Sequence, residues 1–361
     1  MSRERVLKAI RFEGLDRPPL RHQDILPSTF QRHGQALYDL FDKYPPDILS
    51  LTPAMPASYN PPYVEQPDTG RRWMDEWGCL WASLDDTMGQ VLRSALANWD
   101  NLAKYQLPSA DDPHMFAGPL KTRLQSQDKF CTGKVAFGIW DRIMFLRGGQ
   151  SALIDLASEV DKVKQLADRI LEYNLALIQQ WAVVPEPPYR VDGIYITDDY
   201  GLEKGLIMSP NTWRDIFKPR YAEMVQTAHE ASVIVQFHSC GDIRSILPDL
   251  VEIGIDILGP LQAPPLSIED IGREFRGEVT FLGFIDSKEL LHNGSPQQVA
   301  ECVLECIETL GTSKGGYIVA PSTTIMPQVP FENIKTLIQT AAEYRYDHDS
   351  AQRLVQVESS R

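Results

Sequence analysis

Residues 233–241 read Val-Ile-Val-Gln-Phe-His-Ser-Cys-Gly, an apolar run that ends on a histidine and a cysteine. Alternate side chains of an extended chain lie on the same face, so the pattern directs the imidazole of His238 and the thiol of Cys240 into one pocket. Imidazole and thiolate are both ligands that zinc prefers. Taken alone, the pair is more often a hydrogen-bonded histidine beside a buried cysteine. The zinc hypothesis therefore depends on whether other functional residues converge on the same place.

Seven other short apolar runs have the same form. The first lies at Leu20, and the other six cover residues 47–51, 135–139, 193–197, 255–261, 279–285 and 316–320. Most lead into polar side chains with useful chemistry, among them Arg21, Asp24, Arg142, Asp198, Asp199, Tyr200, Gln262, Asp286 and Thr323. Together with the run at 233–237, they give eight candidate strands.

Stretches with helical spacing of apolar residues separate these runs. They cover residues 151–180, 209–217, 243–252, 267–275, 295–310 and 330–344. Ser209 and Ser295 each precede a proline, which is typical of a helix N-cap followed by its first residue. Alternating strands and helices indicate parallel pairing with both sheet faces buried. The sequence therefore predicts an α/β fold, a (β/α)8 TIM barrel, whose functional residues lie at the C-terminal ends of the strands.

The domain organisation follows from the same pattern. One barrel with insertions accounts for residues 1–361 as a single domain. Residues 52–130, approximately, are rich in proline, tryptophan and aspartate, and we expect them to form an N-terminal insertion near the barrel mouth. Trp73, Trp77 and Trp81 within it form either a structural cluster or an apolar lid. The polar segment 347–361 is expected to be a C-terminal tail.

Composition excludes several classes of function. The chain has a net charge of −14, which argues against binding to a nucleic-acid backbone. No stretch approaches the run of about 20 apolar residues that a membrane span needs, and residues 1–6 lack the apolar core of a signal peptide. Five unpatterned cysteines suit a reducing compartment. We therefore expect a cytoplasmic protein that binds neither nucleic acid nor membrane, and we expect no nucleotide cofactor.

Several motifs together resemble the uroporphyrinogen decarboxylase (URO-D) superfamily. They are Ser2-Arg3-Glu4-Arg5-Val6, Asp16-Arg17-Pro18-Pro19, Asp75-Glu76-Trp77-Gly78-Cys79, Asp192-Gly193-Ile194-Tyr195, Asp198-Asp199-Tyr200-Gly201, Phe217-Lys218-Pro219-Arg220-Tyr221, His238-Ser239-Cys240-Gly241, and Ala320-Pro321-Ser322 with Pro330-Phe331-Glu332-Asn333-Ile334. The chain is identified as a member of this superfamily over nearly its whole length. The resemblance implies the (β/α)8 barrel that the strand pattern also predicts.

Two regions indicate the branch of the superfamily. True uroporphyrinogen decarboxylases carry an Arg-Gln-Ala-Gly-Arg-Tyr stretch whose arginines meet substrate carboxylates, whereas residues 21–27 read Arg-His-Gln-Asp-Ile-Leu-Pro and keep one arginine. His238 and Cys240 instead resemble the corrinoid-dependent (cobalamin-dependent) methyltransferase branch. There, the histidine and cysteine bind zinc with a further cysteine near the last strand. Thr323 stands at that position here, so a Zn²⁺ site would need another ligand; Asp199, Gln262 and Asp286 are the candidates.

Roles can be assigned to the polar strand ends as predictions. We predict that Asp199, His238 and Tyr200 are catalytic and that His238 and Cys240 bind a metal. The predicted substrate contacts are Asp24, Arg21, Gln262, Asp286, Thr323 and Arg142. Asp198 is expected instead to cap the following helix or to pair with an arginine. Salt bridges are the structural alternative for Arg142 and Arg147.

Three functions remain open on the sequence. The first is methyl transfer between a small methylated or methoxylated compound and methylcobalamin or a corrinoid protein, which would be co-substrate or partner. The second is decarboxylation of a tetrapyrrole or a smaller acid. The third is small-molecule binding by a barrel that has lost its chemistry. A homodimer is considered as well.

Overall fold

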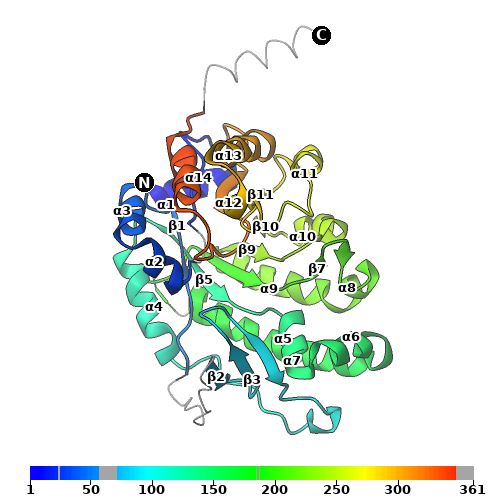
Figure 1. Ribbon diagram of the computed structural model, residues 1–361. Coiled ribbons are helices and arrows are strands. Elements are labelled where there is room, and N and C mark those ends of the chain that lie inside the picture. The colour runs from blue at the N-terminus through cyan, green and yellow to red at the C-terminus, as the bar shows by residue number, and fades with distance from the viewer. Residues whose placement is uncertain (23–24, 57–70, 184, 187, 347–361) are drawn as a thin grey trace. The chain divides into compact units, whose positions relative to one another are not determined.

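The computed structural model describes residues 1–22, 25–56, 71–183, 185–186 and 188–346 (Figure 1). Asp24, part of the predicted insertion and the predicted tail at 347–361 lie outside these ranges. The chain forms two compact units. Unit 1 comprises Met1–Leu49, Asp128–Phe130 and Asp256–Arg361, and unit 2 comprises Ser50–Gln127 and Cys131–Ile255. The single domain over 1–361 stays a prediction.

Unit 2 contains the strands that carry the His238 motif. β5 (Phe130–Val135), β6 (Gly193–Thr197) and β9 (Ile234–His238) pair in parallel in this order. β1 (Ile48–Leu51) comes before β5 in the strand order. The hydroxyl oxygens of Ser50 in β1 and Thr132 in β5 lie 3.1 Å apart. The register pairs Thr197 with His238, so β6 and β9 end side by side.

Helices follow these strands along the chain in unit 2. They are α4 (His114–Gln125), α5 (Trp140–Arg147), α6 (Gly149–Ser158), α7 (Val160–Ile178), α8 (Pro210–Ile216), α9 (Lys218–Glu230) and α10 (Leu247–Glu252). α5, α6 and α7 contact one another (Figure 1). Ser209 caps α8 by accepting a hydrogen bond from the Thr212 N–H, as predicted.

The described part of the predicted insertion forms a small sheet of its own. β2 (Arg71–Met74), β3 (Leu80–Ser83) and β4 (Gln90–Arg93) pair antiparallel. Trp73 and Trp81 are opposite each other in this sheet, and their rings stack with centroids 6.1 Å apart. Trp77 lies between the two strands in sequence and packs edge-on against Tyr173 of α7 instead. Trp73 and Trp81 are therefore cross-strand neighbours in a β-hairpin.

Unit 1 repeats the strand–helix pattern. β10 (Ile257–Leu261), β11 (Thr280–Ile285) and β12 (Tyr317–Pro321) pair in parallel, and Leu20 forms a parallel bridge with Val319 of β12. The helices of this unit are α1 (Ser2–Arg11), α2 (Pro27–His33), α3 (Gln35–Lys43), α11 (Ile268–Phe275), α12 (Leu290–Asn293), α13 (Pro296–Leu310) and α14 (Phe331–Glu343). α13 lies beside α14 (Figure 1). Ser295 forms a complete capping box at the start of α13.

The N-terminal motifs are structural. Asp47 is fully buried and accepts hydrogen bonds from the Leu20 N–H and from the guanidinium groups of Arg5 and Arg17, at 2.8–2.9 Å. Arg5 also pairs with Asp16. A buried carboxylate needs such partners because burial without them is costly. These arginines thus tie α1 and the segment before Leu20 to the start of β1.

Three sequence predictions need correction. The helix predicted over 151–180 is two helices, because Glu159 leaves the helical conformation (φ −138°, ψ 39°) between α6 and α7. The strand predicted over 135–139 is β5 and ends at Val135, and Phe137 adopts a positive φ of 57°. The strand predicted at Leu20 is a single bridge residue.

Strand positions occur in the described residues at or beside all eight predicted runs, and helices follow them in sequence. The fold is therefore α/β, of the (β/α)8 TIM-barrel class, as predicted. Within the described ranges, no helix is both long enough and apolar enough to span a membrane.

Candidate metal site and aromatic cavity

Three ligand-type side chains converge at the ends of β6 and β9. The Cys240 Sγ lies 3.5 Å from the His238 Nε2, and that nitrogen lies 3.7 Å from the Asp199 Oδ1. All three atoms lie within 4.8 Å of one another. We call Asp199, His238 and Cys240 the metal-ligand cluster. The side chain of His238 is 13% exposed and that of Asp199 is 45% exposed, so the cluster is accessible from one side.

The backbone ladder between β6 and β9 continues past the strands and fixes the cluster. The Asp198 N–H donates to the His238 carbonyl, and the Gly201 N–H donates to the Cys240 carbonyl. Between them, the Cys240 N–H donates to the Asp199 Oδ1 at 2.8 Å, and the Tyr200 N–H donates to the Ser239 Oγ at 2.9 Å. The side chains of Asp199 and Ser239 thus replace missing backbone partners. As a result, a carboxylate oxygen is held next to the thiol-bearing residue.

Two glycines allow this close approach. A Cβ on Gly201 would overlap the backbone of Cys240 and Gly241, and a Cβ on Gly241 would overlap the backbone of Gly201. Gly241 also has a positive φ of 74°, which side chains rarely adopt. The Gly after Cys240 in the motif is therefore required by geometry.

Substitution of Gly201 by alanine should separate the two strand ends. We expect the free energy of unfolding to fall by about 1–3 kcal/mol, because the overlap is with backbone that cannot move aside easily. Denaturant unfolding would measure it. Gly149→Ala is the matched control in the same unit, because a Cβ there meets nothing within 4 Å. Equal stability of G201A and G149A would contradict the proposed close packing.

The cluster fits the ligand geometry of zinc. Zn–S bonds of about 2.3 Å and Zn–N bonds of about 2.0–2.1 Å place tetrahedral sulfur and nitrogen ligands roughly 3.5 Å apart. The observed separation of the Cys240 Sγ and His238 Nε2 is 3.5 Å. A catalytic zinc usually has three protein ligands, and Asp199 offers a carboxylate oxygen as a third ligand atom beside the pair. Of the three residues considered from the sequence, Asp199 is the one that the structure brings to the pair within unit 2.

Asp198 has a different environment from its neighbour Asp199. It is completely buried and accepts hydrogen bonds from the N–H groups of Ile139, Trp140 and Asp141 at 2.6–2.9 Å. The hydroxyls of Tyr200 and Tyr221 also donate to it. It therefore caps the N-terminus of α5, where a helix dipole favours negative charge. The sequence prediction of a capping role was right, but the capped helix precedes Asp198 in the chain instead of following it.

Tyr200 lies in the interior beside Asp198. Its ring is fully buried and its hydroxyl donates to Asp198 at 2.9 Å. This hydroxyl therefore supports the cap of α5, and the catalytic role of Tyr200 stays a prediction. Burial raises the pKa of Asp198 to about 6, although its donors act in the opposite direction. Burial and the nearby carboxylates of Asp198 and Asp199 raise the pKa of Asp141 well above its usual range.

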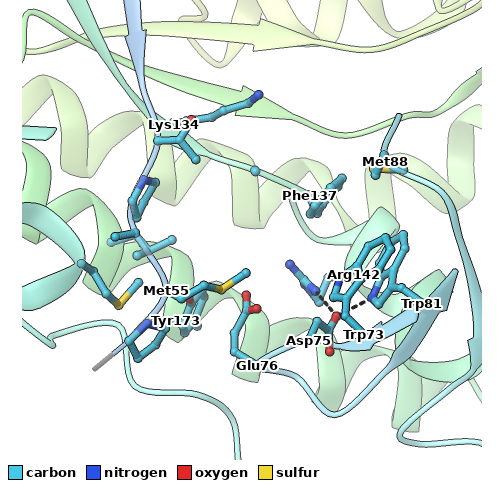
Figure 2. Close-up of a pocket in the computed structure, with 17 residues that line it drawn as sticks. Met55, Trp73, Asp75, Glu76, Trp81, Met88, Lys134, Phe137, Arg142 and Tyr173 are labelled. Carbon is cyan, nitrogen blue, oxygen red and sulfur yellow. Dashed lines mark hydrogen bonds and ion pairs between the residues drawn. The ribbon is translucent and has the colours of Figure 1, made fainter. Parts of the chain in front are cut away.

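A cavity of about 220 Å³ lies within unit 2, among the hairpin β2–β3, α5 and α7 (Figure 2). Four aromatic and three methionine side chains contribute to its lining, and its charged residues are Asp75, Glu76, Lys134 and Arg142. Asp75 accepts hydrogen bonds from the N–H groups of Trp77 and Cys79 and from the Trp81 indole, at 2.7–3.0 Å. Burial raises the pKa of Glu76, and the positive charge of Arg142 partly offsets this. Sequence reasoning missed this cavity, although the motif at 75–79 had been noted.

The predicted residues of unit 1 have the following positions. Arg21 is buried after Leu20 and donates its backbone N–H to Val319. Gln262 is buried at the end of β10. The Asp286 carboxylate accepts from the N–H groups of Lys288, Glu289 and Leu290, which caps the turn before α12. The Thr323 hydroxyl lies 2.6 Å from the Ser287 hydroxyl. Their roles as substrate contacts stay predictions.

Two arginines of α5 separate into distinct roles. Arg147 pairs with Asp155 at 2.8 Å and also donates to the Leu96 carbonyl, which is the predicted structural alternative. Arg142 lines the cavity, and its distance to the Asp75 carboxylate is 3.6 Å, longer than a hydrogen bond. Cys302 and Cys306 both lie on α13, and Cys306 is buried there.

Comparison with known proteins places the chain in a family. Residues 119–344, well over half of the chain, match the family model of uroporphyrinogen decarboxylase (URO-D). The chain belongs to this family. A solved structure described as a methyltransferase from Methanosarcina mazei matches 95% of the chain and 98% of its own, with a TM-score of 0.70 and 17% identity. This similarity supports the barrel fold.

Two curated relatives come from Methanosarcina species. A methylated-thiol–coenzyme M methyltransferase of Methanosarcina mazei is 26% identical over 148 residues, which is 39% of this chain and 36% of the relative. A methylcobamide:CoM methyltransferase (MtaA) of Methanosarcina barkeri is 27% identical over 140 residues, or 38% of each chain. The chain thus matches little more than a third of the length of these relatives. The similarity favours the methyltransferase branch within the family.

Proposed function

We propose that the protein is a methyltransferase that moves a methyl group between a corrinoid and a small thiol or methylated compound, with a metal ion held by Asp199, His238 and Cys240. The observation that carries the proposal is the separation of the thiol and imidazole, 3.5 Å, which suits two ligands of one zinc ion. Methyltransferases named for corrinoid and thiol substrates are among the similar relatives, which supports the same chemistry.

The residues of the cluster have separate tasks in this proposal. His238 and Cys240 supply one nitrogen and one sulfur from the end of β9, and Asp199 supplies an oxygen from the end of β6. When bound, zinc lowers the pKa of a substrate thiol that coordinates it, so that the nucleophilic thiolate of the substrate forms at neutral pH. The hydrogen bond from the Cys240 N–H to Asp199 orients that carboxylate before any metal binds. The hydrogen bonds from the Tyr200 and Tyr221 hydroxyls to Asp198 fix the backbone that follows β6.

The proposed reaction balances without a redox partner. The thiolate sulfur forms a bond to the methyl carbon of the methylated corrinoid as the cobalt–carbon bond breaks. The electron pair of that bond stays on cobalt, and the proton of the thiol is released to water. The products are a thioether and the demethylated corrinoid. A separate corrinoid protein as the carrier of this substrate is part of the proposal.

The zinc-loaded full chain should convert methylcobalamin and a simple thiol, such as 2-mercaptoethanol, into the methyl thioether. Absorbance reports the loss of the cobalt–carbon bond, and mass spectrometry identifies the thioether. A matched incubation with uroporphyrinogen would detect carbon dioxide release. If the protein released carbon dioxide and methylated no thiol in a panel, its activity would be decarboxylation, and the proposal of methyl transfer would be wrong.

A further inference from the structure

Arg142 in the cavity of unit 2 has hydrogen-bond donors that the protein does not use. Its side chain is buried, with only 7% of its surface exposed. Its buried Nε has no hydrogen-bond partner among the described residues. The ion-pair partner that it has, Asp75, lies at 3.6 Å and already accepts three hydrogen bonds from other groups. Leaving charged donors without acceptors is costly, so a ligand that accepts from the guanidinium where it lines the cavity would be favoured.

Aromatic contacts hold the guanidinium in place. Its carbon lies 4.2 Å from the Trp77 ring centroid and 5.3 Å from that of Phe137. Such contacts stabilise a cation without satisfying its N–H groups. Arg142 is therefore positioned in advance, with donor capacity left for an acceptor. Figure 2 shows its guanidinium and the Glu76 carboxyl group pointing toward the same space.

We propose that this cavity binds a small monocarboxylate with a flat apolar body, whose carboxylate accepts hydrogen bonds from Arg142. The aromatic rings of Trp73, Trp81, Phe137 and Tyr173 line the rest of the space and supply faces and edges for a ring. A cavity of about 150 Å³ holds benzene. The 220 Å³ available here accommodates a ring with a carboxylate.

The charges in the cavity favour an anion over a cation. The Arg142 guanidinium lines it, whereas the Lys134 ammonium is directed to the Tyr195 ring, 5.7 Å from the ring centroid. Asp75 is already satisfied by three N–H groups. Burial raises the pKa of Glu76, which weakens the repulsion between its carboxyl group and a bound carboxylate. A bound cation would instead lie beside a buried guanidinium. The inference goes beyond methyl transfer, because binding is expected whether or not the chain transfers methyl groups.

Calorimetric titration of the full chain with three probes of one shape tests the proposal. The probes are benzoate, benzamide and the benzamidinium cation. We expect benzoate to bind about 10–100-fold more tightly than benzamide, because a hydrogen bond to a charged group contributes about 1.5–3 kcal/mol. Benzamidinium should bind more weakly than either. Equal affinities for benzoate and benzamide, tighter binding of the cation, or no saturable binding of benzoate would overturn the proposal.

Substitution separates Arg142 from general effects on the fold. R142K keeps the charge but loses the planar fork of donors. It should lower the affinity for benzoate at least about tenfold and change the affinity for benzamide little. R147K is the matched control, since Arg147 lies on the same helix, is equally buried and has its own partners outside the cavity. If R142K unfolds, W73A tests whether the probes bind in this cavity, because it should lower the affinities for benzoate and benzamide alike. Equal losses of benzoate binding in R142K and R147K would also contradict the proposal.

Discussion

Replacement of Asp198 by alanine should lower the free energy of unfolding by about 3–5 kcal/mol. Five donors converge on this buried carboxylate, and the truncated side chain would leave them without an acceptor. Three of the five are backbone N–H groups at the start of α5, so the loss should spread to that helix. The raised pKa of Asp198, to about 6, shows that burial of its charge has a cost, but the donors cannot find other acceptors in the packed interior.

Denaturant unfolding followed by tryptophan fluorescence would measure this effect. Asp215→Ala is the control in the same unit, because Asp215 is 60% exposed and makes a surface ion pair with Lys164. Its loss should change the free energy of unfolding by less than about 1 kcal/mol. If D198A were as stable as D215A, the hydrogen-bond network around Asp198 would contribute nothing to folding, and its role as the cap of α5 would be wrong.

Replacement of His238 by alanine should reduce zinc affinity by at least about a hundredfold. Loss of a metal ligand has a larger effect than loss of a residue that only orients one, and the latter already costs about 10–100-fold. Asp199→Asn should weaken zinc binding less, because an amide oxygen retains some donor strength. Titration of the metal-free proteins against a competing chelator gives both values.

His114→Ala is the control for this series, since His114 is an exposed histidine at the start of α4 in the same unit. It should bind zinc like the wild type. Loss of affinity in H114A as large as in H238A would mean that the titration reports surface binding. Unchanged affinity in H238A would exclude the metal-ligand cluster as the zinc site.

Much of the fold could be predicted because the strands are local apolar runs that end on polar residues. β5 was placed too late because Thr132, Gly133 and Lys134 interrupt its apolar pattern. Gly133 is there because the ring of Trp181 occupies the space where a Cβ would be. α5 was missed for a related reason. The residue before it offers no capping side chain, and its cap, Asp198, comes from 58 positions further along the chain.

The cluster could be predicted in part because it depends on local alternation and on one parallel register. His238 and Cys240 are two residues apart, and the pairing of Thr197 with His238 brings Asp199 beside them. The cavity could not be predicted, because it depends on a hairpin whose tryptophans have helical spacing. Trp73 and Trp81 lie on opposite strands, and the free donor of Arg142 follows from packing against Trp77. No pattern in a single segment indicates that arrangement.

Methyl transfer at the metal-ligand cluster is the central proposal, and one measurement tests it directly. Methylcobalamin and a thiol are incubated with zinc-loaded wild type, with chelator-treated wild type and with C240S, and loss of the cobalt–carbon absorbance is followed. We predict that the zinc-loaded wild type demethylates the corrinoid and that both other samples are slower by at least about a hundredfold. Equal rates in C240S and wild type, with both proteins folded, would contradict the account.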